Sequence, residues 1–365
     1  MQLGPLAILA LLAPPALAGQ VETSAGPMQI TPVVTGLDEP WGLAFLPDGS
    51  FLVTERAGRL VRVADGVAAE VQGAPAVYAE GQGGLLDVMV PRDFATSREV
   101  WLSYAMPLRG GGATAAGKAV LAVDGTRLEH FTPLFAADPR GGGRHFGARL
   151  VEAADGTVFL TTGDRGTGPE GMQAQDPATA IGKVVHLRRD GEPATARDGW
   201  LPGVWSLGHR NLQGATLDLE GRLLTVEHGA QGGDELNAPE AGRNYGWPVI
   251  SYGVDYGGGR IGVGSAQEGM EQPLHHWVPS IAPSGLMVYS GALVPEWRGD
   301  IFFGSLNSDF LGRLDPDAAG PGGLAEERIS AAETGRVRDV VEAPDGSIWF
   351  LSVYDGAVYR MAPES

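Results

Sequence analysis

The chain has 365 residues, with 44 acidic against 26 basic side chains, a formal net charge of −18, 56 glycines, 26 prolines and no cysteine. The acidic balance argues against a nucleic-acid partner, because phosphate binding requires positive charge, and without cysteine no disulfide can support the fold. The glycines show no G-X-Y period, which excludes collagen, and they fall between short apolar runs, as in an all-β chain rich in tight turns.

Residues 1–18 predict a cleaved signal peptide. From residue 3 onward the segment is apolar or small, and it ends in the A-x-A pattern of Ala16, Leu17 and Ala18, which is typical of a cleavage site. A membrane anchor is the alternative, but the stretch is too short and contains two adjacent prolines. We therefore expect a periplasmic or secreted protein, although no Lys or Arg precedes the apolar segment.

A hairpin pattern recurs six times: a short apolar strand, a turn that is often Asp-Gly, and a second apolar strand. Asp-Gly between apolar runs favours a tight hairpin, because glycine adopts the positive φ that such a turn needs. Six copies predict an all-β, six-bladed β-propeller of four-stranded antiparallel blades. A pair of β-sandwiches is the alternative, and it does not explain the repeat. The copies are 42–54, 149–161, 213–225 and 338–351, with weaker ones at 85–103 and 285–304.

The propeller is expected to occupy residues 30–363 as a single domain, with residues 19–29 as an N-terminal extension. A strand near residues 30–35 should pair with the last blade, because closing the ring removes two exposed sheet edges. The first strand of each blade lines the central channel, so residues at its start should converge on one axis. These are Gln82, His145, Arg210 with Asn211, the loop after Glu227, Trp277, and Arg336 with Arg338.

His145 and Asp164 are the first candidates for chemistry. His145 lies in a glycine-rich loop that enters a strand, and an imidazole is the natural general base near neutral pH. Asp164 ends the second strand of the same hairpin, where a carboxylate could orient the ring. The alternatives are a loop histidine that caps a backbone group and an aspartate that forms a turn.

Arg210 and Asn211 place a cation and an amide at the start of the next inner strand. The planar guanidinium suits an oxyanion or a quinone oxygen, and a structural ion pair is the alternative. Arg336 and Arg338 have i, i+2 spacing, which in a strand puts both side chains on one face. Two cations on a buried face favour an anionic ligand such as a polycarboxylate or a phosphate.

The segment 227–237 combines a glycine-rich loop with two adjacent carboxylates, Asp234 and Glu235. Carboxylates and backbone carbonyls are hard oxygen ligands suited to calcium. The sequence contains no EF-hand loop, no H-E-x-x-H motif and no cysteine-based zinc site. It also has no G-x-G-x-x-G in a βαβ context, so a nicotinamide site is not supported.

Taken together, these segments resemble the soluble glucose and aldose sugar dehydrogenases that depend on pyrroloquinoline quinone (PQQ). The resemblance spans roughly residues 30–361 and rests on eight motifs in the family's order. They are Trp41-Gly-Leu-Ala-Phe, Gly81-Gln-Gly-Gly-Leu-Leu, His145-Phe-Gly-Ala-Arg-Leu, Thr162-Gly-Asp-Arg-Gly, Gly208-His-Arg-Asn, Glu227-His-Gly with Gly233-Asp-Glu-Leu-Asn, Asn244-Tyr-Gly-Trp-Pro and Arg336-Val-Arg-Asp-Val.

The resemblance implies a periplasmic oxidoreductase that oxidises aldoses at C1 to lactones and passes the hydride to PQQ. His145 would take the C1 hydroxyl proton, with Asp164 supporting it. Arg210 would hold the quinone oxygens together with Asn211 and stabilise the charge that develops there.

The remaining roles implied by the resemblance concern the cofactors. The PQQ oxygens and carboxylates would be bound by Gln82, Arg336 and Arg338, and Trp277 would be an aromatic side chain at the cofactor and substrate cleft. One calcium ion would bind the carbonyls of Gly229 and Ala230 together with PQQ. A second, structural calcium ion would be held at Glu235 and Tyr245.

The sequence departs from the family at two places. The family loop usually reads Gly-Pro where this chain has Gly229-Ala230. Where the family carries a lysine that contacts PQQ, this chain has Asn307 or a neighbour. The chain's two lysines, Lys118 and Lys183, are not placed to substitute.

Two other functions stay open: a calcium-dependent propeller lactonase or esterase, and a non-catalytic propeller that binds a glycan or a peptide. A hydrolase has no use for an anion-binding arginine pair, so the orientation of Arg336 and Arg338 discriminates between them. The expected partner is a small-molecule aldose, with no membrane span, an unidentified electron acceptor, and a monomeric or homodimeric state.

Overall fold

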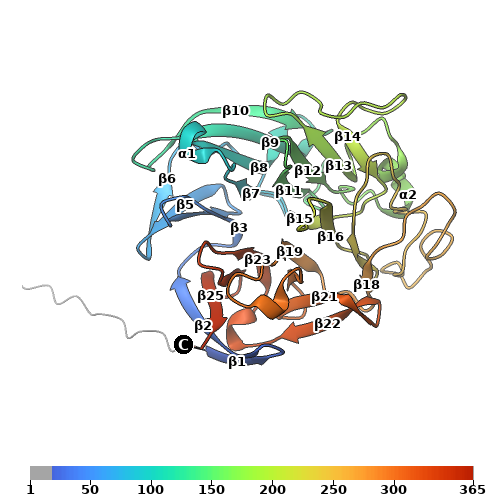
Figure 1. Cartoon of the computed structure of the whole chain (residues 1–365). Helices are drawn as coiled ribbons and strands as arrows, with labels where there is room; N and C mark the ends of the chain where they lie inside the picture. Colours follow the sequence, from blue (N-terminus) through green and yellow to red (C-terminus); the bar gives the residue numbers. More distant parts are fainter. Residues whose placement is uncertain (1–18, 365) are drawn as a thin grey trace, which may run out of the picture.

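The computed structural model describes residues 19–364, and within them six antiparallel sheets are arranged around a central axis (Figure 1). Blade one contains β3 (Pro40–Phe45), β4 (Phe51–Glu55), β5 (Arg59–Ala64) and β6 (Val67–Val71). Blade two contains β7 (Leu85–Met89), β8 (Glu99–Leu108), β9 (Gly111–Leu121) and β10 (Leu128–Ala136), with the short helix α1 (Phe94–Ser97). Blade three contains β11 (Gly147–Glu152), β12 (Val158–Thr162), β13 (Lys183–Leu187) and β14 (Val204–Leu207), with α2 (Gly168–Gly171) and the 3-10 turn η1 (Gln173–Gln175).

The other three blades complete the ring. Blade four contains β15 (Leu212–Leu217), β16 (Leu223–Glu227), β17 (Asp234–Asn237) and β18 (His275–Trp277). Blade five contains β19 (Pro283–Val288), β20 (Ile301–Ser305), β21 (Leu311–Gly320) and β22 (Gly323–Ile329), with η2 (Pro295–Trp297). Blade six contains η3 (Ala332–Thr334), β23 (Val337–Glu342), β24 (Ile348–Ser352) and β25 (Ala357–Pro363), together with β1 (Gly19–Thr23) and β2 (Gly26–Val34) from the start of the described chain.

The six-bladed propeller predicted from the repeats is confirmed. Each predicted hairpin forms the first two strands of one blade, and the first strands pack side by side around the axis. β2 pairs with β25, from Met28 opposite Pro363 to Val34 opposite Val358, so the predicted closure near residues 30–35 is also confirmed. The residues of the expected N-terminal extension form β1 and the first part of β2, and β1 is a fifth strand of blade six.

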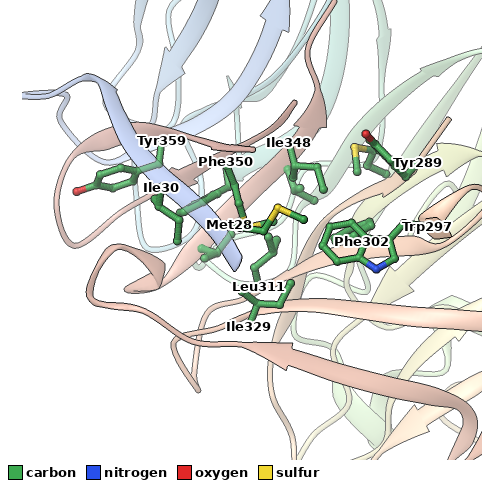
Figure 2. Packing of buried hydrophobic residues seen from close by; sticks show 14 of the residues in the cluster. Met28, Ile30, Tyr289, Trp297, Phe302, Leu311, Ile329, Ile348, Phe350 and Tyr359 are labelled. Carbon is green, nitrogen blue, oxygen red and sulfur yellow. The ribbon is translucent and has the colours of Figure 1, made fainter. Parts of the chain in front are cut away.

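The closing strand also contributes to the core. Met28 and Ile30 of β2 are buried among apolar side chains of blades five and six (Figure 2). Burying an apolar side chain of this size stabilises a fold by about 1.5–3 kcal/mol, so the closure rests on packing as well as on backbone hydrogen bonds. The expected signal peptide, residues 1–18, lies outside the described residues. In the described chain, no helix has the length and apolar character needed to cross a membrane.

Irregular pairing marks the start of every inner strand. A β-bulge re-aims the side chains beside it, so the six bulges direct residues at this end of the blades toward the axis. Glycine is needed where the inner strands approach most closely, because a Cβ at Gly285 would lie 2.6 Å from the Cα of Asp339. The register shifts lie between Pro40 and Gly42, Leu85 and Val88, Gly147 and Leu150, Leu212 and Gly214, Ser284 and Leu286, and Val337 and Asp339.

Candidate active site

A buried ion triad joins the inner strands at the axis. Arg149 of β11 contacts Asp87 of β7 at 3.1 Å and Asp339 of β23 at 3.0 Å. The Arg149 guanidinium also lies 4.3 Å from the ring centre of Trp41 in β3. Four inner strands therefore meet at one cation.

Arg336 and Arg338 line a cavity of about 120 Å³ beside this triad, together with Gln82. Arg338 donates to Gln213 Oε1 at 2.7 Å and Arg336 to the carbonyl of Leu306 at 2.9 Å, and neither pairs with a carboxylate of the described chain. Burial, with repulsion from Arg149 and Arg336, lowers the pKa of Arg338 to about 9.

Arg336 and Arg338 line the same cavity, but the prediction that they do so as alternate residues of one strand is wrong. Arg336 precedes β23 and has a φ of +50°, so the i, i+2 rule for strands does not apply to it. The left-handed turn at Arg336 and the bulge after Val337 bring the two guanidiniums together instead.

His145 and Asp164 form a buried pair at the mouth of blade three. His145 Nδ1 lies 2.6 Å from Asp164 Oδ1, and the His145 backbone has a φ of +51°, which side-chain-bearing residues rarely adopt. Burial tends to raise the pKa of Asp164, but hydrogen bonds from His145 and Gly166 and the charge of Arg210 lower it overall. Burial lowers the pKa of His145 despite the opposing hydrogen bond to Asp164.

The protonation state of the pair follows from these shifts. Asp164 is ionised near neutral pH, so the neutral imidazole of His145 donates its Nδ1–H to the carboxylate, and Nε2 carries the lone pair. Among the described residues Nε2 has no hydrogen-bond partner, and His145 lines a cavity of about 520 Å³ together with Gln82, Arg144, Arg210, Trp247 and Tyr256. The ring is therefore an oriented base that faces an open cavity.

Arg210 and Gln82 share this cavity with His145, whereas Asn211 does not. Gln82 accepts the backbone N–H of His145 at 2.8 Å and lines both cavities. Arg210 donates to the carbonyl of His228 at 3.1 Å, and its Nε is buried without a partner in the described structure. Asn211 is 1% exposed, and its Oδ1 accepts from Gly147 and Gln213, so it holds the start of β11 in place.

The loop carrying Gly229 and Ala230 is held by Asp234. This buried carboxylate accepts from the backbone N–H groups of Gly229, Ile281 and Ala282 and from the Ser280 hydroxyl. These donors occupy both of its oxygens, so Asp234 fixes the loop rather than offering free ligand atoms.

Glu235 lies opposite Glu227 across the β16–β17 ladder. Burial and repulsion from Glu227 raise the pKa of Glu235 to about 8. Both carboxylates, with Tyr245, line a cavity of about 10 Å³, and the adjacent Asn237 has a buried Oδ1 without a hydrogen-bond partner in the described chain.

The Tyr245 hydroxyl is not free to bind a metal, since it donates to the carbonyl of Ala238 at 2.6 Å. The Tyr245 ring stacks on His209. Residues 19–364 contain no cluster of three or more His, Cys, Asp or Glu side chains arranged to hold a metal. A cation here would therefore need backbone oxygens in addition to Glu235.

Trp277 does not fit its expected place at the cleft. It belongs to β18, the outermost strand of blade four, is 3% exposed, and packs 5.0 Å from the ring of Phe303 in blade five. A side chain on an outer strand that faces the next blade becomes core. The aromatic residues that do line the cavity are Trp247 and Tyr256. The Asn244–Pro248 motif signalled Trp247, whereas no pattern marks Tyr256 in its long loop.

The loop at Asn307 carries no cation of its own. The Asn307 side chain donates to the carbonyl of Ser280 at 3.3 Å, and the nearby positive charge is Arg336, bound to Leu306. Lys118 pairs with Glu99 at 2.9 Å. Lys183 is buried, and its ammonium group donates to three backbone carbonyls. Neither lysine therefore reaches the axial cavities, as expected.

Comparison with known proteins gives a consistent result. The family model described as Glucose / Sorbosone dehydrogenase matches residues 37–360. The chain is 37% identical over 343 residues to "Aldose sugar dehydrogenase YliI" of Escherichia coli K12, covering 90% of this chain and 91% of the relative. A solved structure named glucose dehydrogenase is similar at TM-score 0.86 and 40% identity, covering 92% of this chain and 99% of that chain. The PQQ-bound form of Aldose Sugar Dehydrogenase from Streptomyces coelicolor is similar at TM-score 0.75 and 26% identity, covering 92% and 98%.

Proposed function

Because the chain belongs to the glucose/sorbosone dehydrogenase family, we propose that it is a PQQ-dependent sugar dehydrogenase that oxidises aldoses at C1 to lactones. The observation that carries the proposal is the pairing of His145 with Asp164, 2.6 Å apart, in the same cavity as Arg210. An oriented neutral base beside an unpaired cation suits removal of a hydroxyl proton as negative charge develops nearby.

The residues of the neighbouring cavity fit PQQ, which is a planar quinone with three carboxylates. Arg336 and Arg338 are guanidiniums without carboxylate partners in the described chain, and burial, together with repulsion from Arg149 and Arg336, lowers the pKa of Arg338. An anionic ligand would relieve that repulsion and accept bidentate hydrogen bonds. Gln82 lines both cavities and would span the cofactor and the substrate.

In the proposed reaction, the chemistry that PQQ would supply when bound is that of an ortho-quinone, a two-electron acceptor for the C1 hydride of a sugar that leaves as its lactone. His145 Nε2 takes the proton of the C1 hydroxyl as the C–H bond breaks. Asp164 keeps the ring oriented and stabilises the imidazolium that forms, and Arg210 holds the charge that develops on the cofactor side.

Calcium is part of the proposal. One ion would bind the carbonyls of Gly229 and Ala230 and act as a Lewis acid on the quinone, in the loop that Asp234 fixes. A second would bind near Glu235, where Glu227 and Glu235 line a cavity that has room for about one water molecule or small ion. Tyr245 would help to close this second site through its backbone.

The arginine pair also bears on the alternatives. Arg336 and Arg338 both line the axial cavity, which favours an anionic cofactor over a calcium-dependent lactonase. A non-catalytic glycan-binding propeller does not explain why a base with an open Nε2 faces the cavity. We further propose export through residues 1–18, with residues 30–363 as the catalytic domain acting as a monomer or homodimer on a soluble aldose.

Reconstitution tests the proposed function. The purified mature chain is mixed with PQQ and calcium, and quinone absorbance and dye reduction are followed with a panel of aldoses. We expect a bound quinone spectrum and dye reduction that requires both PQQ and sugar. Binding of PQQ without turnover of any aldose would overturn the proposed activity, and turnover without added or bound PQQ would overturn the cofactor.

A further inference from the structure

Trp247 contacts both members of the proposed machinery at once. Its indole Nε1 donates to Asp164 Oδ2 at 2.8 Å, while Oδ1 of the same carboxylate is engaged by His145. The face of its ring lies 5.1 Å from the Arg210 guanidinium. One side chain therefore ties the base, through its carboxylate, to the cation of the same cavity.

The backbone of Trp247 is fixed from two directions. Its N–H donates to the carbonyl of Gly208, two residues before Arg210, at 2.8 Å. Its carbonyl accepts from the Gln175 side chain at 2.8 Å, and Gln175 also pairs with Asn244 through both amide groups. The position of the indole is thus set by the segment that carries Arg210 and by η1.

Arg210 and Asp164 are close but do not pair. The charge of Arg210 lowers the pKa of Asp164, and the Asp164 backbone N–H donates to the carbonyl of Arg210 at 2.7 Å. Even so, no carboxylate of the described chain lies within ion-pair distance of the Arg210 guanidinium, whose Nε is buried without a partner. A cation–π contact with an indole stabilises a desolvated guanidinium.

We propose that Trp247 is a positioning residue whose ring keeps Arg210 from forming an ion pair with Asp164 and so leaves Asp164 on His145, while its N–H draws charge from that carboxylate. An Arg210–Asp164 pair would draw the carboxylate from the base and the cation from the cavity. Trp247 prevents both because its ring face holds the guanidinium, whereas its N–H donates to the second carboxylate oxygen and reduces the negative charge that faces His145. The inference rests on the proposed function only for the purpose of His145 and Arg210, since the contacts themselves do not depend on a cofactor.

The titration of His145 reads out this arrangement in the apo-protein. The charged and titratable groups facing the ring are Asp164 after β12, Arg210 before β15, Arg144 on its own loop and His228 after β16. Trp247 acts on two of these groups, Asp164 and Arg210. A change in their arrangement therefore appears in the pKa of His145, which can be followed by NMR after assignment with His145→Gln.

The two substitutions at Trp247 have opposite expected effects. Trp247→Phe keeps an aromatic ring over Arg210 but removes the N–H, so Asp164 stays on His145 with one donor fewer and holds the imidazolium more strongly. Loss of a hydrogen bond to a charged group should raise the pKa of His145 by about one unit. Trp247→Ala also removes the ring, so Arg210 pairs with Asp164 and the pKa of His145 falls.

Trp205→Phe is the matched control. Trp205 also donates its indole N–H, to the carbonyl of Pro239 at 3.0 Å, and it contacts neither Asp164 nor Arg210. Both tryptophans contribute to packing, so both Phe variants should lose some stability, but Trp205→Phe should leave the His145 titration unchanged.

The experiment separates this inference from the proposed function. A rise in the His145 pKa for Trp247→Phe and a fall for Trp247→Ala support it. Equal titrations for Trp247→Phe, Trp205→Phe and wild type overturn it, as does a shift of both Trp247 variants in one direction. If Trp247→Ala does not fold, the comparison of the two Phe variants decides. Failure to bind PQQ would overturn the proposed function and leave this titration readable.

Discussion

At the scale of single residues, the reactivity of the site depends on the protonation of His145. Burial holds the pKa of His145 below its ordinary 6.5, although the hydrogen bond to Asp164 opposes this. A depressed histidine pKa keeps the neutral, proton-accepting form populated to lower pH. The acid limb of kcat/KM should therefore lie below pH 6.5 in the reconstituted enzyme. An acid limb above pH 6.5 would show that another group is the base.

The same residue gives the first substitution test. His145→Ala removes the base but retains the backbone N–H that donates to Gln82, so the loop should persist. General-base assistance contributes about 10²–10⁴-fold, and kcat should fall by that order while PQQ affinity stays near that of wild type. Dye-reduction assays measure kcat, and titrations with PQQ measure the affinity. A variant with wild-type kcat across the pH range would remove His145 from the mechanism.

Arg338 should behave differently from His145. It lines the axial cavity without a carboxylate partner in the described chain, so Arg338→Ala should weaken PQQ binding by roughly 10–100-fold, the value of a charge-assisted hydrogen bond. Arg56→Ala is the comparison, since Arg56 lines the same cavity but already pairs with Glu39 at 2.6 Å. Equal losses of affinity for the two variants would show that charge in general, rather than the unpaired Arg338, binds the cofactor.

At the scale of elements, features set by neighbouring residues could be predicted from the sequence, whereas contacts between distant segments could not. The Asp-Gly turns predicted the inner hairpins because a tight turn is decided by its own residues. The burial of Trp277 could not be predicted from its own segment, because a side chain of an outer strand is buried by residues of the next blade. Trp247 contacts Asp164, 83 residues away, and its loop has no periodic pattern from which that contact could be predicted.

The β16–β17 hairpin carries the test of the second calcium ion. Glu235 faces Glu227 across the ladder, so a cation would neutralise a buried pair of carboxylates. Calcium at 100 times its Kd should stabilise the native apo-protein by about 2.7 kcal/mol, measured as a rise in Tm. Glu235→Gln should lose that response, while Glu220→Gln, whose carboxylate is exposed on the preceding turn, should keep it. A calcium response that survives in Glu235→Gln would place the ion elsewhere.

At the scale of the whole molecule, the ring is closed twice. β2 completes blade six at the periphery, and the ion triad of Arg149, Asp87 and Asp339 joins blades two, three and six at the axis. The triad could not be predicted from the sequence, because its members are spread over more than half the chain and each belongs to an ordinary inner strand. The triad also fixes the main chain beside the axial cavity, since Arg149 donates to the carbonyl of Arg338.

Arg149→Met tests whether the axial triad holds the propeller together. Burial raises the pKa of Asp87 to about 6, and Arg149 opposes that rise. Because the folded-state pKa exceeds the ordinary 3.8, the ionised Asp87 costs folding free energy at pH above about 6, and this cost disappears as the pH falls through 3.8. Removing Arg149 leaves two buried carboxylates facing each other without a cation, so the cost should increase. Breaking a buried pair from one side costs about 3–5 kcal/mol, and we expect that loss in urea unfolding of the apo-protein at pH 8. At pH 5 the loss should be smaller, because a carboxylate of the triad can then take up a proton.

Arg222→Met is the control for this prediction. Arg222 pairs with Asp218 on an exposed turn, and its removal should cost at most about 1 kcal/mol at either pH. An equal loss for Arg149→Met at both pH values would mean that lost packing against Trp41, rather than unpaired charge, sets the stability of the axis.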